Sequence, residues 1–298
     1  MQSVTKKRKS GVRMGRGTYA LFTLPPLALY TVFFVFSVLY GLYYSFTNWN
    51  GYARSYEFVA FKNYARLFTD RVFKNALTFT VEYTVILVIA VNMIALLLAV
   101  LLCSKIKKQT FFRATFFFPA TLSLITIGLV FNEIYYRALP VLGQAMGIDW
   151  LSKNILSSSS TAMWGILVVH VWKSVSVPMV LLIAGMQNIS TDLYEAASID
   201  GANAVQRFFK ITLPLLMPVL SVCVILVTKE GLTVYDYIMT MTSGGPAGST
   251  QSIAFLIYEN AFVNTKFSYA ITQSVVIFAL VCLVSFFQFR TTRGKKEA

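Results

Sequence analysis

Charged side chains are scarce in this chain. Asp, Glu, Lys and Arg make up 13% of its 298 residues, whereas hydrophobic residue types make up 56%. Soluble domains carry about 25% charged residues. Together with repeated apolar runs long enough to cross a bilayer, this scarcity excludes an ordinary soluble domain. The composition therefore predicts an all-α membrane protein, because a backbone in lipid must satisfy its polar groups within helices.

Side chains that carry catalysis or bind metals are also rare. There is one histidine, His170, so no histidine cluster can form. The phosphate-binding sequence GxxxxGK followed by Ser or Thr is absent. The three cysteines all fall inside apolar runs, without the spacing of a disulfide framework or a zinc site. We therefore expect no enzymatic activity, no metal site and no cofactor bound by this chain.

Six apolar runs predict six membrane-spanning helices. They cover residues 19–44, 79–103, 114–135, 162–186, 217–239 and 269–289. No short repeat divides these runs, so one membrane domain is expected. The predicted divisions are a basic N-terminus at 1–17, a six-helix domain at 18–290 with its core at about 75–290, and a basic tail at 291–298.

The distribution of the 26 Lys and Arg residues predicts the orientation in the membrane. With the N-terminus inside, the inner segments hold 16 of these residues, the outer segments hold 8 and the spans hold 2. Because basic residues collect on the cytoplasmic side, both termini are expected in the cytoplasm. The net charge of +14 is therefore explained by basic residues that set the orientation in the membrane. Nucleic-acid binding is not expected, because the chain lacks a basic face interleaved with aromatic residues.

Residues 192–214 form the one long polar stretch in the second half of the chain, DLYEAASIDGANAVQRFFKITLP. This stretch is predicted to form a short helix, a turn and a second short helix outside the membrane. Asp192 is expected to cap the first helix, with Glu195 three residues on. Gly201 permits a left-handed turn, and Pro214 is expected to limit the second helix. The small residues leave nearly bare faces, so another backbone can approach closely.

This stretch resembles the EAA loop of permease subunits of binding-protein-dependent ABC importers, in the carbohydrate branch of that family. Within a coupling loop at 187–214, the matching residues are Glu195, Ala196, Ala197, Asp200, Gly201, Ala202, Leu213 and Pro214. The resemblance implies a MetI-like permease fold whose loop is a cytoplasmic coupling helix, seated in a groove of an ATPase. It also implies two ATPase subunits that bind ATP and Mg, in the plasma membrane of a prokaryote. The alternative, an amphipathic helix on the bilayer surface, is disfavoured by the small apolar area of the stretch.

Polar side chains deep in two spans mark a candidate substrate cavity. His170, Lys173 and Ser174 share one face of the fourth span, and Glu230 and Gly231 share one face of the fifth. Ionisable groups are costly inside a bilayer and are functional candidates there. In maltose-type permeases these two faces line the path of the sugar, which implies the same for these five residues. Lys173 and Glu230 either pair with each other or meet a charged or amino-substituted sugar, and His170 is equally well explained as a hydrogen-bonded packing residue.

The segment TSGGP, residues 242–246, resembles the segment after the fifth span in the first of two paired sugar permeases. The resemblance implies that Gly244, Gly245 and Pro246 form a loop facing an extracytoplasmic binding protein. It also implies a second, homologous permease subunit that completes a heterodimer. An ordinary exit turn is the simpler alternative for this segment.

The expected function is the import of a sugar or oligosaccharide across the membrane. Glycerol phosphate or another small polar solute is the alternative substrate within the same family. A secondary transporter driven by an ion gradient, with Lys173 and Glu230 as its ion site, is a second alternative. A membrane-embedded enzyme or an assembly subunit is a third, although no inner face carries a catalytic cluster.

Overall fold

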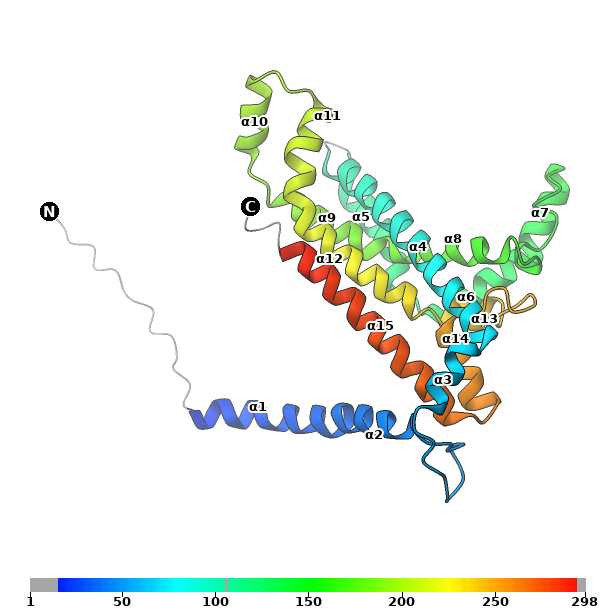
Figure 1. Cartoon of the computed structure of the whole chain (residues 1–298). Coiled ribbons are helices and arrows are strands. Elements are labelled where there is room, and N and C mark those ends of the chain that lie inside the picture. Colours follow the sequence, from blue (N-terminus) through cyan, green and yellow to red (C-terminus); the bar gives the residue numbers. More distant parts are fainter. Residues whose placement is uncertain (1–15, 105–106, 294–298) are drawn as a thin grey trace.

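The structure, a computed structural model, describes residues 16–104 and 107–293, and the regular secondary structure in this part of the chain is helical, apart from an isolated bridge between Thr47 and Phe58 (Figure 1). The predicted basic N-terminus and tail lie mostly outside the described residues. The α-helices are α1 (Arg16–Tyr30), α2 (Phe36–Tyr44), α3 (Lys62–Thr69), α4 (Arg71–Cys103), α5 (Gln109–Phe117), α6 (Leu124–Glu133), α7 (Leu139–Met146), α8 (Ala162–Ser174), α9 (Ser176–Gln187), α10 (Thr191–Ile199), α11 (Ala204–Arg207), α12 (Leu213–Leu232), α13 (Asp236–Met241), α14 (Ile253–Tyr258) and α15 (Phe267–Arg293). The π-helical segments are η1 (Thr31–Val35), η3 (Ile134–Ala138), η5 (Phe208–Thr212) and η6 (Glu259–Val263), and the 3₁₀ segments are η2 (Phe118–Thr121) and η4 (Ile155–Ser157).

Five continuous helices are long and apolar enough to cross a membrane. They are Gly17–Tyr44, Arg71–Cys103, Ala162–Gln187, Ala204–Leu232 and Phe267–Gln288. A bent pair, Gln109–Thr121 and Leu124–Met146, supplies a sixth if the two halves count as one span. The all-α membrane fold predicted from the sequence is therefore present, with the third span broken rather than straight.

The break in the third span turns the chain by 96°. Pro119 lies within η2 and has no N–H for the carbonyl of Thr115, four residues earlier, so the regular α-helical bonding ends here. The next carbonyl, that of Phe116, accepts a hydrogen bond of 2.8 Å from the hydroxyl of Ser176 on α9. A side chain from another span thus satisfies the backbone where the helix is interrupted, as a membrane interior requires.

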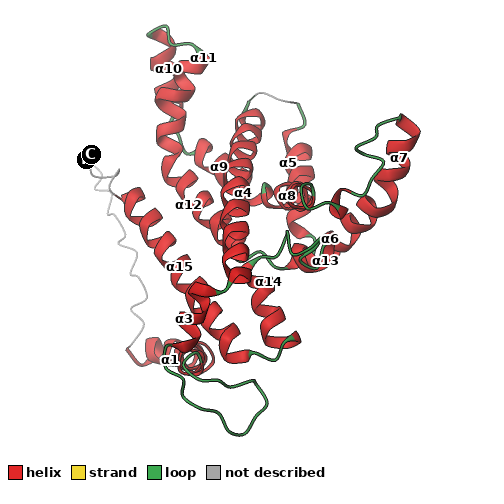
Figure 2. Cartoon of the chain, turned by 45° about the vertical axis from the view of Figure 1, so that its right-hand side comes forward, coloured by secondary structure: helices red, strands yellow, loops and turns green. Residues whose placement is uncertain are grey.

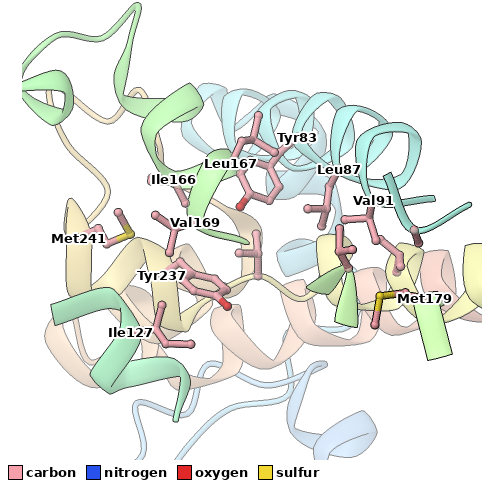
Figure 3. Close-up of a cluster of buried hydrophobic side chains, with 14 of the residues drawn as sticks. Tyr83, Leu87, Val91, Ile127, Ile166, Leu167, Val169, Met179, Tyr237 and Met241 are labelled. Carbon is pink, nitrogen blue, oxygen red and sulfur yellow. The ribbon is translucent and has the colours of Figure 1, made fainter. Parts of the chain in front are cut away.

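Helix α4 is at the centre of the bundle and packs against α8, α9, α12 and α14. Its buried side chains recur every three or four residues along one face, which includes Tyr83, Leu87, Val91 and Ala95. Figure 3 shows part of this stripe meeting side chains from α6, α8, α9 and α13. Because lipid tails are as apolar as these side chains, close packing rather than exclusion of water stabilises the interface.

The fifth span differs from its predicted bounds of 217–239. One continuous helix runs from Ala204 through η5 to Leu232, so the expectation that Pro214 limits the second short helix is wrong. Pro214 has no N–H for the carbonyl of the residue four positions earlier, and the wider π turn of η5 lets the helix pass this point. The chain then leaves the helix at residues 233–235 and enters the short helix α13.

The two ends of the bundle carry different elements. In Figures 1 and 2, α10 and α11 project from one end, while α3, the loop at 45–61 and η6 lie toward the other. We call these the α10 end and the α3 end. The C-terminal end of α4 and the start of α5 lie toward the α10 end (Figure 2).

The first helix leaves the bundle. The segment Gly17–Tyr44, here called the arm, projects away from the other helices (Figure 1), and none of its side chains is buried. At about 42 Å it is long enough to cross the hydrocarbon core of a bilayer. Its contact with the bundle is near its C-terminal end, where Gly41 approaches Ile271 of α15. The arm thus carries a long apolar surface that the other described residues leave uncovered.

Candidate functional site

A polar cavity of about 140 Å³ lies where α8, α12 and α13 meet. Four of the five predicted substrate-lining residues, His170, Lys173, Ser174 and Glu230, line it together. The other lining residues are Leu124, Thr233, Val234, Tyr235, Asp236 and Tyr237. The helical spacing on two spans therefore does bring these four polar side chains to one place.

Glu230 and the side chains of α8 form a hydrogen-bonded group. The Ser174 hydroxyl donates to Glu230 Oε2 at 2.7 Å, and His170 Nε2 lies 3.8 Å from the same oxygen. His170 Nδ1 is 2.8 Å from the hydroxyl of Tyr83 on α4. Both Tyr83 and His170 are buried, so removing the Tyr83 hydroxyl would leave a ring nitrogen unsatisfied, at a cost of about 1–3 kcal/mol.

Two side chains of the cavity have capacity left for a ligand. The hydroxyl of Tyr237 is buried, and no hydrogen-bond partner for it exists among the described residues. The side chain of Glu230 is 45% exposed, with its Oε2 held by Ser174. Carboxylates and hydroxyls of this kind are suited to bind the hydroxyl groups of a polyol or sugar.

The cation of Lys173 does not form the ion pair with Glu230 that the sequence left open. Within the described ranges, Glu133 forms an ion pair with Arg137, and the carboxylate of Glu230 lies 3.8 Å from the imidazole of His170 rather than against Lys173. The amino group of Lys173 is therefore available to solvent or ligand at the cavity wall.

Gly231, the fifth predicted residue, is outside the cavity lining and faces α4. A Cβ at Gly231 would lie 2.8 Å from Thr84 Oγ1, so this glycine permits the close approach of α12 to α4. The predicted role of Gly231 in the substrate path remains a prediction, and its position indicates helix packing.

Several residues in or behind the cavity were missed in the sequence. Tyr83, the buried partner of His170, lies on the apolar stripe of α4, where the pattern indicates only packing. Tyr235, Asp236 and Tyr237 follow the end of α12 at Leu232. The predicted fifth span continues to residue 239, so it assigns these residues to the span and not to the cavity. The cluster of Tyr, Asp and Tyr inside an apolar span was the available signal.

The predicted coupling loop forms a hairpin of α10 and α11, here called the α10 hairpin, residues 190–212. Gly201 has φ +76°, which confirms the predicted left-handed turn. The Ala202 N–H donates to the carbonyl of Ala197, and the Gly201 N–H donates to that of Ser198, which is a Schellman motif. Asn203 and Gln206 then form a capping box that starts the next helix. These local bonds fix the reversal of the chain between residues 199 and 204.

The predicted cap at Asp192 is wrong. Ser190 is the N-cap of α10, and its hydroxyl accepts a hydrogen bond from the Asp192 N–H. Asp192 instead lies in the first turn of α10, where its negative charge interacts favourably with the positive end of the helix dipole. Glu195 is exposed and bonded to no cap, so it remains available for a partner.

Two side-chain hydrogen bonds join the halves of the hairpin. The hydroxyls of Tyr194 and Thr212 are 2.8 Å apart, and Arg207 Nη1 donates to Ser198 Oγ at 2.6 Å.

The predicted coupling residues are mostly accessible. Glu195, Ala196, Asp200 and Gly201 are exposed, Ala197 and Ala202 are partly exposed, Leu213 is partly buried and Pro214 is exposed at the start of α12. The tip is also apolar, since Ile199 is 87% exposed and Val205 is 65% exposed. A rigid tip of small and apolar residues is suited to a protein partner.

The loop that contains Gly244, Gly245 and Pro246 is tied to the bundle. Gly244 is buried with φ +80°, and a Cβ there would lie 2.8 Å from the ring of Phe255. Thr250 donates from its hydroxyl to the carbonyl of Gly245 at 2.6 Å. Gly245 and Pro246 are partly exposed, and the predicted contact with a binding protein stays a prediction.

The charged groups do not form a recognisable metal site. Through residues 16–104 and 107–293, no group of three or more His, Cys, Asp or Glu side chains could hold a metal ion. The expectation that this chain binds no cofactor stays a prediction.

Comparison with known proteins gives consistent similarities. The family model described as "Binding-protein-dependent transport system inner membrane component" matches residues 6–292. The multiple sugar-binding transport system permease protein MsmF of Streptococcus mutans is 38% identical over 272 residues, covering 91% of this chain and 94% of the relative. The sn-glycerol-3-phosphate transport system permease protein UgpA of Brucella abortus is 28% identical over 267 residues, covering 89% and 91%. A solved bacterial ABC transporter involved in the import of the acidic polysaccharide alginate aligns with a TM-score of 0.79 at 18% identity, covering 93% of this chain and 94% of that chain, which shows the same fold.

Proposed function

Since the chain belongs to the family of inner-membrane components of binding-protein-dependent transport systems, we propose that it is one of two permease subunits of an ATP-driven sugar importer. The observation that carries this proposal is the pairing of two features in one bundle. A polar cavity lies among α8, α12 and α13, and a rigid hairpin with an exposed apolar tip projects from one end. The first feature is suited to a solute, and the second to a protein that drives the bundle.

A second permease subunit completes the proposed pore. The arm leaves the bundle with its apolar surface uncovered, and Glu230 at the cavity is 45% exposed in the single chain. In addition, α4, α5 and α8 border an apolar hollow of about 580 Å³ that nothing in the described chain fills. A homologous subunit with its own arm would cover such surfaces and close the cavity.

Two ATPase subunits are the proposed motor. One would receive the α10 hairpin in a groove, with Glu195 and Ile199 at the contact, and ATP and Mg would be bound by the ATPases. The end that carries the hairpin would then face the cytoplasm, and the α3 end would face a binding protein outside. Closure of the ATPases would move the hairpin as a rigid body and exchange inward-facing and outward-facing states of the bundle.

The proposed substrate is a sugar or oligosaccharide. Carboxylate and hydroxyl groups of Glu230, Ser174 and Tyr237 are placed at the cavity, and the sugar permease MsmF is a relative. A phosphorylated solute such as glycerol phosphate is the second candidate, because Lys173 has no ion-pair partner among the described residues and UgpA is also a relative.

The test of the motor proposal is co-purification of the ATPase with a tip variant. Ile199→Asp places a charge in the proposed apolar contact and is expected to lower ATPase affinity about tenfold or more, the scale of an interface hot spot. Val263→Asp changes a residue that is 65% exposed toward the α3 end and should leave co-purification unchanged. Equal ATPase recovery with both variants and the unmodified chain would count against the proposed coupling.

A further inference from the structure

A row of aromatic rings runs from the loop at the α3 end to the polar cavity. In order, the rings belong to Tyr44, Trp49, Phe267, Phe262, Tyr258 and Tyr235, here called the aromatic ladder. Centroids of neighbouring rings are between 4.6 and 5.9 Å apart along the whole row. Such separations are typical of aromatic rings in direct contact.

The ladder joins segments that are far apart in the sequence. Its rings come from the end of the arm and the loop after it, from the start of α15, from α14 and η6, and from the link between α12 and α13. Tyr235 is both the last ring of the ladder and part of the cavity lining. The ladder is therefore continuous with the candidate substrate site.

The outer part of the ladder is held in place by the backbone. Gly51, with φ +96°, lies directly against the ring of Phe267, where any Cβ would clash. The Ser268 N–H donates to the carbonyl of Trp49 at 3.0 Å, and Trp49 Nε1 donates to the carbonyl of Ala53 at 3.0 Å. Because the indole N–H is already satisfied, Trp49 offers ring surface rather than a donor.

The row is open to solvent at Phe262, which is 61% exposed, while the other five rings of the ladder are partly buried. Beside the ladder, Tyr52 is 70% exposed, and its ring centroid is 5.9 Å from that of Phe267. Polar side chains accompany the row: Glu259, which accepts a hydrogen bond from Gln251, follows Tyr258 in the chain, and the exposed Asn264 ends η6. Aromatic faces beside carboxylate and amide groups combine the two kinds of contact that a sugar makes.

We propose that the aromatic ladder is a track on which the rings of an incoming oligosaccharide stack between delivery and the polar cavity. One face of a sugar ring presents C–H groups, which are attracted to the negative face of an aromatic ring, while its hydroxyls remain free to bond polar side chains. Stacking of this kind tolerates different substrates, as base stacking does in proteins that bind single strands. This inference rests on the proposed function and narrows its substrate to solutes that carry rings, with an effect that grows with the number of sugar units.

The test uses the complete importer reconstituted in vesicles with its binding protein. Uptake is measured for glucose and for malto-oligosaccharides up to maltopentaose, with glycerol 3-phosphate as a solute without a ring. Phe262→Ala is expected to lower kcat/KM for maltopentaose about fivefold, the scale of one lost aromatic contact, and to leave glycerol 3-phosphate uptake unchanged. Phe262→Trp should restore uptake.

Two further variants keep the test decisive. Tyr52→Ala removes an exposed ring that contacts Phe267 of the ladder, and it should produce the same dependence on chain length if Phe262→Ala fails to fold. Phe68→Ala removes a ring that is 78% exposed on α3, apart from the ladder, and should have no effect.

The contrary outcomes are distinct. Unchanged uptake of every oligosaccharide in Phe262→Ala and Tyr52→Ala would overturn the ladder and leave the sugar importer standing. An equal loss for every solute, including glycerol 3-phosphate, would also overturn it, because that result assigns the rings to docking of the binding protein. Uptake of glycerol 3-phosphate with no sugar uptake by the unmodified importer would instead remove the sugar proposal itself.

Discussion

At the scale of single residues, Lys173 offers the clearest test of the cavity. Its side chain lines the cavity, and it takes part in no ion pair within the described part of the chain. We predict that Lys173→Gln raises the KM for uptake about tenfold without lowering the amount of folded protein, since one charge-assisted hydrogen bond to the solute is lost. Lys229→Gln, which changes an exposed neighbour outside the cavity lining, is the matched control. Unchanged KM and unchanged substrate range in Lys173→Gln would exclude a contact with the solute.

The pKa of Asp70 predicts how the stability of the α3 end depends on pH. Burial would raise the pKa of its carboxyl group, but hydrogen bonds from the Tyr269 hydroxyl and from the N–H groups of Phe73 and Val72, with the charge of Arg66, hold that pKa below its ordinary value. A lowered pKa in the folded state means that the charged form stabilises the fold above the unfolded pKa of about 4. This stabilisation is lost as the pH falls through the lower, folded pKa.

The corresponding measurement is the thermal unfolding temperature of the purified protein as a function of pH. We expect Asp70→Asn to unfold at a lower temperature than the unmodified chain at neutral pH, because the charged acceptor for Tyr269 at 2.6 Å is gone. The difference should shrink as the pH falls below about 4. Asp149→Asn, at an exposed position, should follow the unmodified chain at every pH. A constant difference for Asp70→Asn across the range would contradict the assigned charge effect.

The residues of the cavity were predictable where polar groups interrupt an apolar span. Helical spacing groups His170, Lys173 and Ser174 on one face, the resemblance to maltose-type permeases joins this face to that of Glu230, and all four residues line one cavity. The partner of His170 could not be predicted, because Tyr83 is on another span and the pairing depends on how two helices pack. For the same reason, the sequence could not show that Gly231 faces α4 rather than the cavity, because its position depends on how closely α12 approaches α4.

At the scale of elements, the α10 hairpin is expected to transmit force because its two halves are bonded together. Tyr194→Phe removes the hydrogen bond to Thr212 and little else. We predict that this variant still binds the ATPase but imports several-fold less solute for each ATP hydrolysed, measured as uptake and phosphate release in the same vesicles. Tyr136→Phe removes a hydroxyl from a residue that is 63% exposed elsewhere and should not change this ratio. An unchanged ratio in Tyr194→Phe would show that the bond does not contribute to coupling.

The existence of the spans followed from hydropathy, whereas their irregularities did not. The runs at 19–44 and 162–186 match the helices Gly17–Tyr44 and Ala162–Gln187 closely. The 96° break lies between Thr121 and Leu124, close to a carbonyl that is satisfied by a hydroxyl from α9, and the helix passes Pro214 beside a π turn. Both features are decided by contacts or local geometry that no hydrophobic pattern records.

At the scale of the whole molecule, the family match and the similarity to solved transporters confirm the predicted permease fold. The departure of the arm from the bundle could not be read from its sequence, because a span that packs on its own bundle and one that packs on a partner are equally apolar. The single chain consequently exposes apolar surface and an open polar cavity, as the proposed pairing with a second permease subunit predicts.

The most direct measurement is solute uptake into sealed vesicles that contain this chain, its partner permease, the ATPases and the loaded binding protein. If the bundle is moved by an ATPase through the α10 hairpin, uptake will require ATP and will continue after a protonophore has collapsed the proton gradient. Uptake by the chain without ATPases, or uptake that stops with the gradient while ATP is maintained, would contradict this mechanism.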